Sequence, residues 1–436
     1  MIKERVDMMK KFINICEWLL FIFSLLLIPF FKDKITTIII IPLCIFLYYL
    51  LKKINIKNYS LFLFIIAFII RLISIIYLKV EITDDFKIML EASKSLVKGN
   101  LSFVNAWYFK TFSYQLGHVL YQAPLLKIVN RVFFLKIINS LITSLSVVLI
   151  YKITKKLFKE ETARVVSFAY LFYLYPVYLN SVLTNQLLPA LIYLFVIYLI
   201  ISKENNIKLS FIISLLLCIA NFLRTESIVF ILGIIIYNMF TITKKNYKEI
   251  IKYTSVLLIT YLIVNTIISS IIFISPIKTK LVNNAPYWKF YCGLSDKHNG
   301  LYNEEDQTVF FNSNNQKELL INRVKEENIK IPILILKKEV ILWTQTNYDL
   351  RIKNNLNNLV LKWNQGYLNI ILILFIISLF PTKTTKNKKL LLLKIIIAIY
   401  IGVYAFIEIS PRYAYILHLL VFLLIPNALE KLKRGD

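Results

Sequence analysis

Long apolar segments alternate with short polar ones along almost the whole chain, from Phe12 to Leu429. Most of these segments reach the roughly 17 to 25 residues that a helix needs to cross a hydrocarbon core of roughly 30 Å. They are continuous, whereas the strands of an outer-membrane barrel alternate apolar and polar residues over about 10 positions. The pattern therefore predicts an all-α polytopic membrane protein and argues against a soluble domain and a barrel.

We expect about twelve transmembrane helices of this kind. Their predicted bounds are 12–30, 35–51, 60–79, 132–151, 165–180, 185–202, 209–223, 227–243, 253–274, 367–380, 390–407 and 413–430. Two long polar segments interrupt the series, at about 80–131 and 275–366. Helical periodicity within them predicts short helices, one ending at Gly99 and one over 316–343.

The composition agrees with a membrane protein, since 58% of the 436 residues are hydrophobic. The formal charge is +27, from 52 Lys and Arg against 25 Asp and Glu. Most basic residues lie between apolar segments, so we interpret them as topology signals and as contacts to anionic membrane lipid. We expect no nucleic-acid partner.

The basic clusters predict the orientation of the chain. With the N-terminus inside, the clusters on the cytoplasmic side are Lys52/Lys53/Lys57, Lys152/Lys155/Lys156/Lys159/Arg164, Lys244/Lys245/Lys248/Lys252, Lys383/Lys386/Lys388/Lys389 and Lys431/Lys433/Arg434. The positive-inside rule then places both termini in the cytoplasm and both long segments on the outer face, and we expect the membrane to be the plasma membrane.

This topology divides the chain into four parts. Residues 1–59 form an N-terminal transmembrane hairpin, and residues 60–274 form a transmembrane core that contains the first external segment. Residues 275–366 form the large external segment, and residues 367–436 form the C-terminal transmembrane helices. Connections between bundled helices usually have about 2 to 8 residues. External segments this long therefore suggest that the chemistry lies on the outer face.

The sharpest candidate for chemistry is the acidic pair Asp84 and Asp85, in TDDF just after the third predicted span. A carboxylate at a membrane surface suits a general base. The same residues also fit an ordinary helix N-cap, in which Thr83 or Asp84 caps a helix that starts near Phe86. Both interpretations hold if Asp84 caps and Asp85 projects.

Four further polar segments fall on the predicted outer face. YLYPVYLNSVLTNQ (173–186) suits a head-group contact or a tight turn, and FLRTES (222–227) suits a binding turn or a pair of interfacial anchors. EISPRY (408–413) holds Glu408 and Arg412 at membrane depth, where they either pair with each other or Arg412 binds a phosphate. PYWKFYCGLSDKHNG (286–300) suits a binding loop or a peripheral interfacial loop.

Several other chemistries are not expected. The three histidines are scattered, so we predict no zinc site, although a divalent metal is not excluded. No glycine-rich phosphate loop is present, which argues against an ATP-driven pump. Three of the four cysteines lie in apolar segments, which argues against a disulfide framework.

The ordered set of these segments resembles the GT-C superfamily of polytopic membrane glycosyltransferases. More closely, it is similar to the dolichyl-phosphate-mannose protein mannosyltransferase-like group, family 39. The resemblance runs from about residue 60 to 425. The motifs that support it are the acidic pair with Ala92, Leu96 and Gly99, YFKTFSYQLGHVLYQAPLLKI, YP..L.S.VLTNQ, FLRTES, YWKFYCGL..K.NG and E..PRY.

The resemblance implies an inverting transfer of a sugar from a polyprenyl-phosphate-linked donor to a glycan, lipid or protein acceptor at the outer face, without a cofactor. It implies that Asp85, or else Asp84, is the general base. The implied donor phosphate ligands are Arg412, then Arg224 and Lys289. Further substrate-binding residues implied by the matching segments are Glu226, Glu408, Tyr108, Gln115, Asn185 and Trp288.

The sequence departs from the family where Thr184, Asn185 and Gln186 stand in place of an acid that many members carry. The second external segment is also shorter than the folded domains of some relatives, and one extra apolar hairpin precedes the acidic pair. Two alternatives remain at this stage. A lipid-linked glycan flippase or polysaccharide polymerase would not need Asp84 or Asp85 for chemistry, and a membrane scaffold would tolerate substitution in all five segments.

Overall fold

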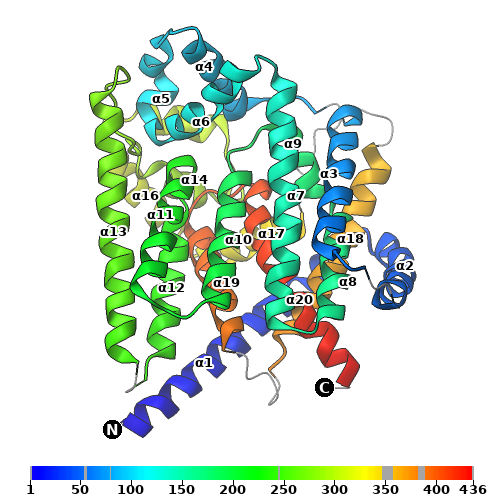
Figure 1. The fold of residues 1–436 in the computed structure, drawn as a ribbon. Helices are drawn as coiled ribbons and strands as arrows, with labels where there is room; N and C mark the ends of the chain where they lie inside the picture. Colours follow the sequence, from blue (N-terminus) through cyan, green and yellow to red (C-terminus); the bar gives the residue numbers. More distant parts are fainter. Residues whose placement is uncertain are drawn as a thin grey trace.

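A computed structural model shows the chain as a bundle of helices (Figure 1). The structure describes residues 2–53, 56–78, 80–243, 246–345, 357–381 and 388–434. The chain is 81% helical, and the described residues contain no β-strand beyond one isolated bridge between Leu301 and Ile409. The predicted all-α polytopic class is therefore confirmed.

Eight helical segments among the described residues are long and apolar enough to cross a membrane, judged by length and composition. They comprise α1 (Ile2–Leu25) with the turn after it, α2 (Lys34–Lys53), α3 (Tyr59–Tyr77), α7 (Val132–Leu157), α13 (Tyr247–Ile274), α18 (Asn357–Leu379), α19 (Lys389–Phe406), and α20 (Ala414–Arg434) with the 3-10 turn η5 (Pro411–Tyr413). The multi-pass architecture follows from these helices.

The span predicted at 165–180 is broken in two. Helices α8 (Glu160–Leu171) and α9 (Leu174–Val182) meet at an angle of 47°. The physical reason is Pro176, whose ring clashes with the carbonyl four residues earlier, at Phe172, where the helix stops. If this bent pair is one crossing, the described residues contain nine candidate spans.

Three further apolar helices coincide with predicted spans, but with 15 to 17 residues they are shorter than the eight segments above. They are α10 (Leu187–Ser202), α11 (Ile207–Leu223) and α12 (Ser227–Thr241). On length and composition the described residues thus support fewer crossings than the twelve predicted. Figure 1 shows α11, α12 and α13 side by side, and both ends of the chain lie at the same end of the bundle.

The first long segment folds into short helices at the other end of the bundle (Figure 1). These are α4 (Asp84–Val97), η2 (Ser102–Asn105), α5 (Trp107–Thr111), η3 (Ser113–Gln115) and α6 (Leu116–Ile128). The predicted stop at Gly99 is confirmed: its φ is +76° and the Asn100 amide donates to the Ser95 carbonyl. A Cβ at Gly117 would lie 1.6 Å from the Phe222 carbonyl oxygen, so glycine lets α6 approach α11.

The second long segment contributes α14 (Trp288–Gly293), α15 (Glu304–Asn312), α16 (Gln316–Glu327) and α17 (Ile331–Thr344). The helical stretch predicted over 316–343 is found as two helices, α16 and α17, with a break at 328–330. The segment docks on the first one: the Ser113 hydroxyl lies 2.7 Å from the Lys280 carbonyl oxygen, and the Asn284 amide donates to the Thr111 carbonyl at 3.0 Å. We call the end of the bundle that carries these two segments the loop end.

Within the bundle, buried polar contacts join the helices. Arg71 of α3 is fully buried, and its Nε donates to the Thr143 hydroxyl of α7 at 2.9 Å. The same hydroxyl lies 3.0 Å from Oδ1 of Asn180 in α9. A charge at this depth is costly unless it is hydrogen-bonded, so these contacts hold α3, α7 and α9 together.

Candidate functional site at the loop end

Three cations surround the ring of Tyr413. The Arg224 guanidinium lies 5.0 Å from the ring centroid, the Lys289 ammonium 5.5 Å and the Arg412 guanidinium 5.6 Å. They come from the α11–α12 turn, from α14 and from η5, which are far apart in the sequence. An aromatic face attracts cations, so Tyr413 helps to hold like charges close together. The structure thus brings all three predicted phosphate ligands to one place, which we call the Tyr413 cluster.

The predicted base lies beside this cluster. One Asp85 carboxylate oxygen is 3.9 Å from a guanidinium nitrogen of Arg412, and the Arg412 guanidinium also lies 5.1 Å from the Phe86 ring centroid. The Asp85 side chain is 42% exposed and that of Arg412 is 22% exposed. The carboxylate is therefore next to the cations and still open to a reactant.

The neighbouring acid faces differently. Asp84 is exposed with a φ of +51°, and its carboxylate accepts a hydrogen bond from the Thr83 hydroxyl at 2.9 Å. Thr83 occupies the N-cap position of α4, but its side chain makes no capping hydrogen bond. Thr83 is thus at the N-cap position, as the N-cap interpretation expects. Its hydroxyl does not donate or accept a capping hydrogen bond, however, because it donates to the Asp84 carboxylate.

A chain of polar contacts holds Arg224. Its Nε donates to the Glu226 carboxylate, and its Nη1 donates to Oδ1 of Asn185 at 3.0 Å. The Asn185 amide in turn donates to Oε1 of Gln115 at 3.0 Å. Burial opposes the charge of Arg224, but the Glu226 carboxylate outweighs this effect and raises the Arg224 pKa. Three predicted binding residues, Glu226, Asn185 and Gln115, therefore position a fourth.

Lys289 and Glu408 are joined through the backbone, because the Glu408 amide donates to the Lys289 carbonyl at 2.6 Å. The Tyr413 side chain raises the pKa of Lys289, against the effect of burial. Burial raises the pKa of Glu408, while Lys289 and Arg412 oppose the rise. Glu408 forms no ion pair within the described part of the chain, so of the two alternatives for this segment the Glu408–Arg412 pair is not seen there. Among the described carboxylates, that of Asp85 lies 3.9 Å from Arg412.

A close backbone contact fixes the segment that carries Glu408 and Arg412. A Cβ at Gly293 would lie 2.2 Å from the carbonyl carbon of Ile407, so only glycine lets α14 approach so closely. Buried Lys338 donates to the carbonyls of Gly293, Ala405 and Ile407 at 2.8 to 3.0 Å. These contacts tie the second long segment to the end of α19 and so position Lys289 beside Tyr413.

The two remaining predicted residues lie in different settings. Tyr108 of α5 is near the base: burial raises its pKa, and the charge of Asp85 adds to the rise. Trp288 is 4% exposed and packs against Phe310 and Phe311, with ring centroids 5.3 Å and 5.2 Å away. Its contacts are those of a packing residue within the second segment, and a binding role for it stays a prediction.

Sequence reasoning missed Tyr413, Tyr114 and Lys338. Tyr413 directly follows Arg412, so the quoted motif contained it, but a single aromatic residue among 27 tyrosines carries little signal. Tyr114 lies near the cluster: burial raises its pKa and Lys289 opposes the rise. Lys338 stands in an apolar helix. A charged residue in such a helix usually has a buried partner or a function, and this could have singled out Lys338 from the sequence.

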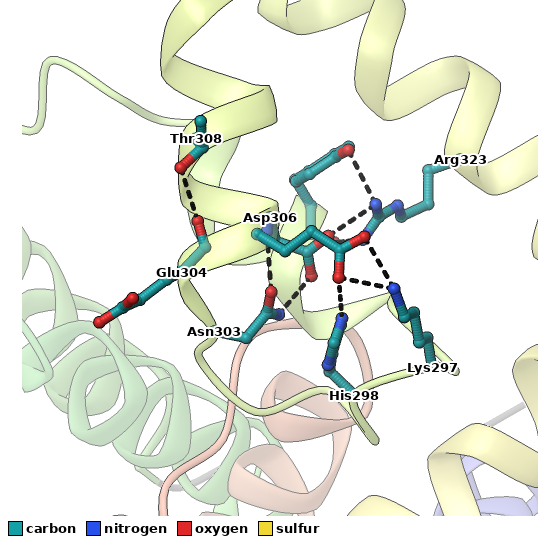
Figure 2. Close-up of polar contacts among 9 residues, drawn as sticks. Lys297, His298, Asn303, Glu304, Asp306, Thr308 and Arg323 are labelled. Atoms are coloured by element: carbon teal, nitrogen blue, oxygen red, sulfur yellow. Dashed lines mark hydrogen bonds and ion pairs between the residues drawn. The ribbon is translucent and has the colours of Figure 1, made fainter.

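A second group of charged residues lies within α14–α16 (Figure 2). Arg323 donates to the Asp306 carboxylate and to the Tyr291 hydroxyl, both at 2.8 Å, and its guanidinium lies 3.8 Å from the Tyr291 ring centroid. Burial alone would raise the pKa of Asp306, but hydrogen bonds from Arg323 and Asn303 lower it overall. We call this group the Asp306 cluster. Nowhere in the described chain do three or more His, Cys, Asp or Glu side chains gather as a metal ion would require.

Comparison with known proteins adds one finding. No curated protein sequence matches the chain. The sequence model of the family described as dolichyl-phosphate-mannose-protein mannosyltransferase matches residues 122–269, about a third of the chain. The matched part contains Asn185, Arg224 and Glu226 of the site, whereas Asp85, Lys289 and Arg412 lie outside it. The resemblance to this family and the apolar helices together indicate a multi-pass membrane glycosyltransferase of the GT-C type.

Proposed function

We propose that the protein transfers a sugar from a polyprenyl-phosphate-linked donor to an acceptor at the outer face of the plasma membrane, with inversion at the anomeric carbon. The Tyr413 cluster binds the donor phosphate, and Asp85 takes the proton from the acceptor hydroxyl. The observation that supports this most is the convergence of three cations on one ring with a carboxylate 3.9 Å from the nearest of them.

The cations suit a lipid phosphate for two reasons. Guanidinium groups bind phosphate oxygens through paired hydrogen bonds, and Lys289 adds a point charge that forms no ion pair among the described residues. The leaving group of the reaction is the lipid phosphate itself, on which negative charge develops as the glycosidic bond breaks. Fixed cations at that position lower the barrier because they stabilise the transition state more than the ground state.

The base must approach the anomeric carbon from the side opposite the phosphate. Asp85 and Arg412 come from different elements, α4 and η5, and approach each other without a short ion pair. A sugar bound between them would separate the carboxylate from the guanidinium and place them on its two sides. The acceptor hydroxyl then attacks the anomeric carbon, its proton passes to Asp85, and the lipid phosphate leaves toward the Tyr413 cluster.

The test uses cells that lack the protein and are complemented with wild type, Asp85→Asn or Asp296→Asn. Asp296 is a matched control because it is an aspartate of the second segment whose carboxylate is ion-paired with Lys337 at 2.9 Å. Mass spectrometry of extracted lipids measures polyprenyl-phosphate sugars. We expect one phosphate-linked monosaccharide to accumulate in the null cells and with Asp85→Asn, but not with wild type or Asp296→Asn.

Two outcomes contradict the proposal, and a third, measured with the additional variant Asp84→Asn, would change the residue that acts as base. Unchanged monosaccharide pools with a well-expressed Asp85→Asn protein would remove the carboxylate from the chemistry. Accumulation of larger lipid-linked glycans alone would favour the flippase or polymerase alternative. Loss of function in Asp84→Asn but not in Asp85→Asn would move the role of base by one residue.

A further inference from the structure

A cleft of about 630 Å³, counted with its open mouth, lies where the ends of α2 and α20 meet the start of α8. Its lining includes four basic residues, Lys52, Lys159, Lys433 and Arg434, and two acidic ones, Glu161 and Glu430. We propose that this cleft binds the head group of an anionic phospholipid. The site is separate from the Tyr413 cluster, and no part of the proposed transfer reaction requires it.

The cleft carries an excess of positive charge. Glu430 is already engaged, since its carboxylate accepts from the Lys159 backbone amide at 3.2 Å and lies 3.6 Å from Arg434. By contrast, the ammonium groups of Lys52, Lys159 and Lys433 form no ion pair with any residue that the structure describes. Four basic side chains against two acidic ones, Glu161 and Glu430, leave the lining with two positive charges in excess. This excess on one concave surface suits a phosphate-containing head group.

The sequence brings these cations together from three distant clusters. Lys52 belongs to the cluster after the second span, Lys159 to the cluster after α7, and Lys433 to the C-terminal cluster. From the sequence alone, these clusters are interpreted as topology signals and as general contacts to anionic lipid on one side of the membrane. Because α8 packs against α2 and α20, the three lysines line one cleft. A topology signal requires only that basic residues lie on the same side of the membrane, not that they meet in a cleft.

Apolar surface beside the cleft favours a lipid over a soluble phosphate. On α2, the side chains of Ile45, Phe46 and Tyr49 are 52 to 61% exposed. They stand within two turns of the lining residues Tyr48 and Lys52 on the same helix. A phospholipid can place its head group among the lysines and its acyl chains along these side chains, whereas a soluble phosphate gains nothing from them.

The test is a lipid titration of the purified full-length protein in detergent, read by native mass spectrometry. The probes are phosphatidylglycerol, phosphatidylcholine and glycerol 1-phosphate. The variants are Lys52→Gln/Lys159→Gln/Lys433→Gln and the matched control Lys203→Gln/Lys208→Gln/Lys252→Gln, whose three lysines are exposed and do not line the cleft. Both variants remove three charges, so the control accounts for the change in net charge.

We expect wild type and control to bind phosphatidylglycerol more tightly than phosphatidylcholine. In the cleft variant we expect the dissociation constant for phosphatidylglycerol to rise by roughly tenfold or more. Equal affinity for phosphatidylglycerol in the cleft variant and the control would overturn the proposal. Binding of glycerol 1-phosphate as tight as that of the lipid would also overturn it, because the ligand would then be a soluble phosphate.

Discussion

The Tyr413 cluster and the Asp306 cluster use the same kinds of side chain in different ways. In each, an arginine lies over a tyrosine ring, at 3.8 Å for Arg323 over Tyr291 and 5.0 Å for Arg224 over Tyr413. Arg323 also has a short, buried carboxylate partner in Asp306, which is 4% exposed. The Tyr413 cluster instead holds three cations that are matched unequally. Arg224 is ion-paired with Glu226, whereas Lys289 forms no ion pair among the described residues. The Asp85 carboxylate, 3.9 Å from Arg412, is 42% exposed.

This difference separates a structural ion pair from a candidate binding site. Where an arginine and a carboxylate form an ion pair within the protein, as in the Asp306 cluster, no charge is left for a ligand to neutralise, and the pair stabilises the fold. Where cations are gathered around a ring and only partly matched, an anion completes the site. Four substitutions or conditions test the comparison, in order of decreasing expected effect.

The largest effect is expected from Gly293→Ala, because the new methyl group overlaps the backbone at Ile407 and Glu408. The contact between α14 and the end of α19 should open, displacing Lys289 from Tyr413. We expect sugar transfer to fall by about two orders of magnitude or more, the range of a misplaced active-site group. The control is Gly402→Ala, whose Cβ meets no atom within 4 Å and should leave transfer unchanged. Equal activity of the two variants would show that the close contact does not position the site.

Arg323→Gln tests the structural cluster. It leaves the buried Asp306 carboxylate without its cation, a change that typically costs about 3–5 kcal/mol. We expect faster hydrogen exchange across residues 288–327, measured by mass spectrometry, with donor affinity changed by less than about twofold. Lys330→Gln removes a more exposed cation that is 3.3 Å from Glu327 and serves as the control. A loss of donor affinity without faster exchange would mean that the Asp306 cluster also binds ligand.

Arg412→Gln tests the Tyr413 cluster, and here we expect donor affinity to fall while local stability stays unchanged. We expect the dissociation constant of a polyprenyl-phosphate sugar to rise by about 10- to 100-fold, since one charge-assisted phosphate contact is lost. Hydrogen exchange of the second segment should stay as in wild type. Arg412→Lys should recover only part of the affinity, because an ammonium lacks the paired donors of a guanidinium. Wild-type affinity in Arg412→Gln would contradict phosphate binding at this residue.

The smallest effect concerns pH. The pKa of Asp306 is lowered in the folded protein, so its contribution to stability is fully present above the pKa of the unfolded carboxyl group, about 3.9, and is lost as the pH falls through the folded value. Thermal unfolding of wild type and Asp306→Asn should therefore differ most at neutral pH and converge on acidification below pH 4. A difference that stays constant down to pH 2 would show that the ionised carboxylate is not the stabilising form.

The sequence predicts the membrane class and the helical segments well, because length and apolar composition are local properties. It does not predict the break at Phe172–Tyr173, although Pro176 supplies the reason, since proline is compatible with both an N-terminal turn and a kink. Nor does it place Trp288, because an aromatic residue in a polar segment suits an interface and a small core equally.

For the candidate site too, the sequence predicts single residues but not how distant segments pack together. Arg224, Lys289, Arg412 and Asp85 were each identified from their own segment, but their meeting around Tyr413 depends on how four elements pack. The Asp306–Arg323 pair joins residues 17 positions apart on two helices, so no helical spacing indicates it. Gly293 and Lys338 act through backbone contacts with the end of α19, which local sequence does not reveal.

The most direct test of the central claim separates donor binding from transfer in one purified protein. With a defined polyprenyl-phosphate sugar, donor affinity and single-turnover transfer are measured for wild type, Asp85→Asn and Arg412→Gln. We expect Asp85→Asn to bind the donor within about threefold of wild type but to transfer sugar about 10²–10⁴-fold more slowly, as for loss of a general base. Arg412→Gln should lose affinity first. An Asp85→Asn protein that binds and transfers like wild type would contradict the account.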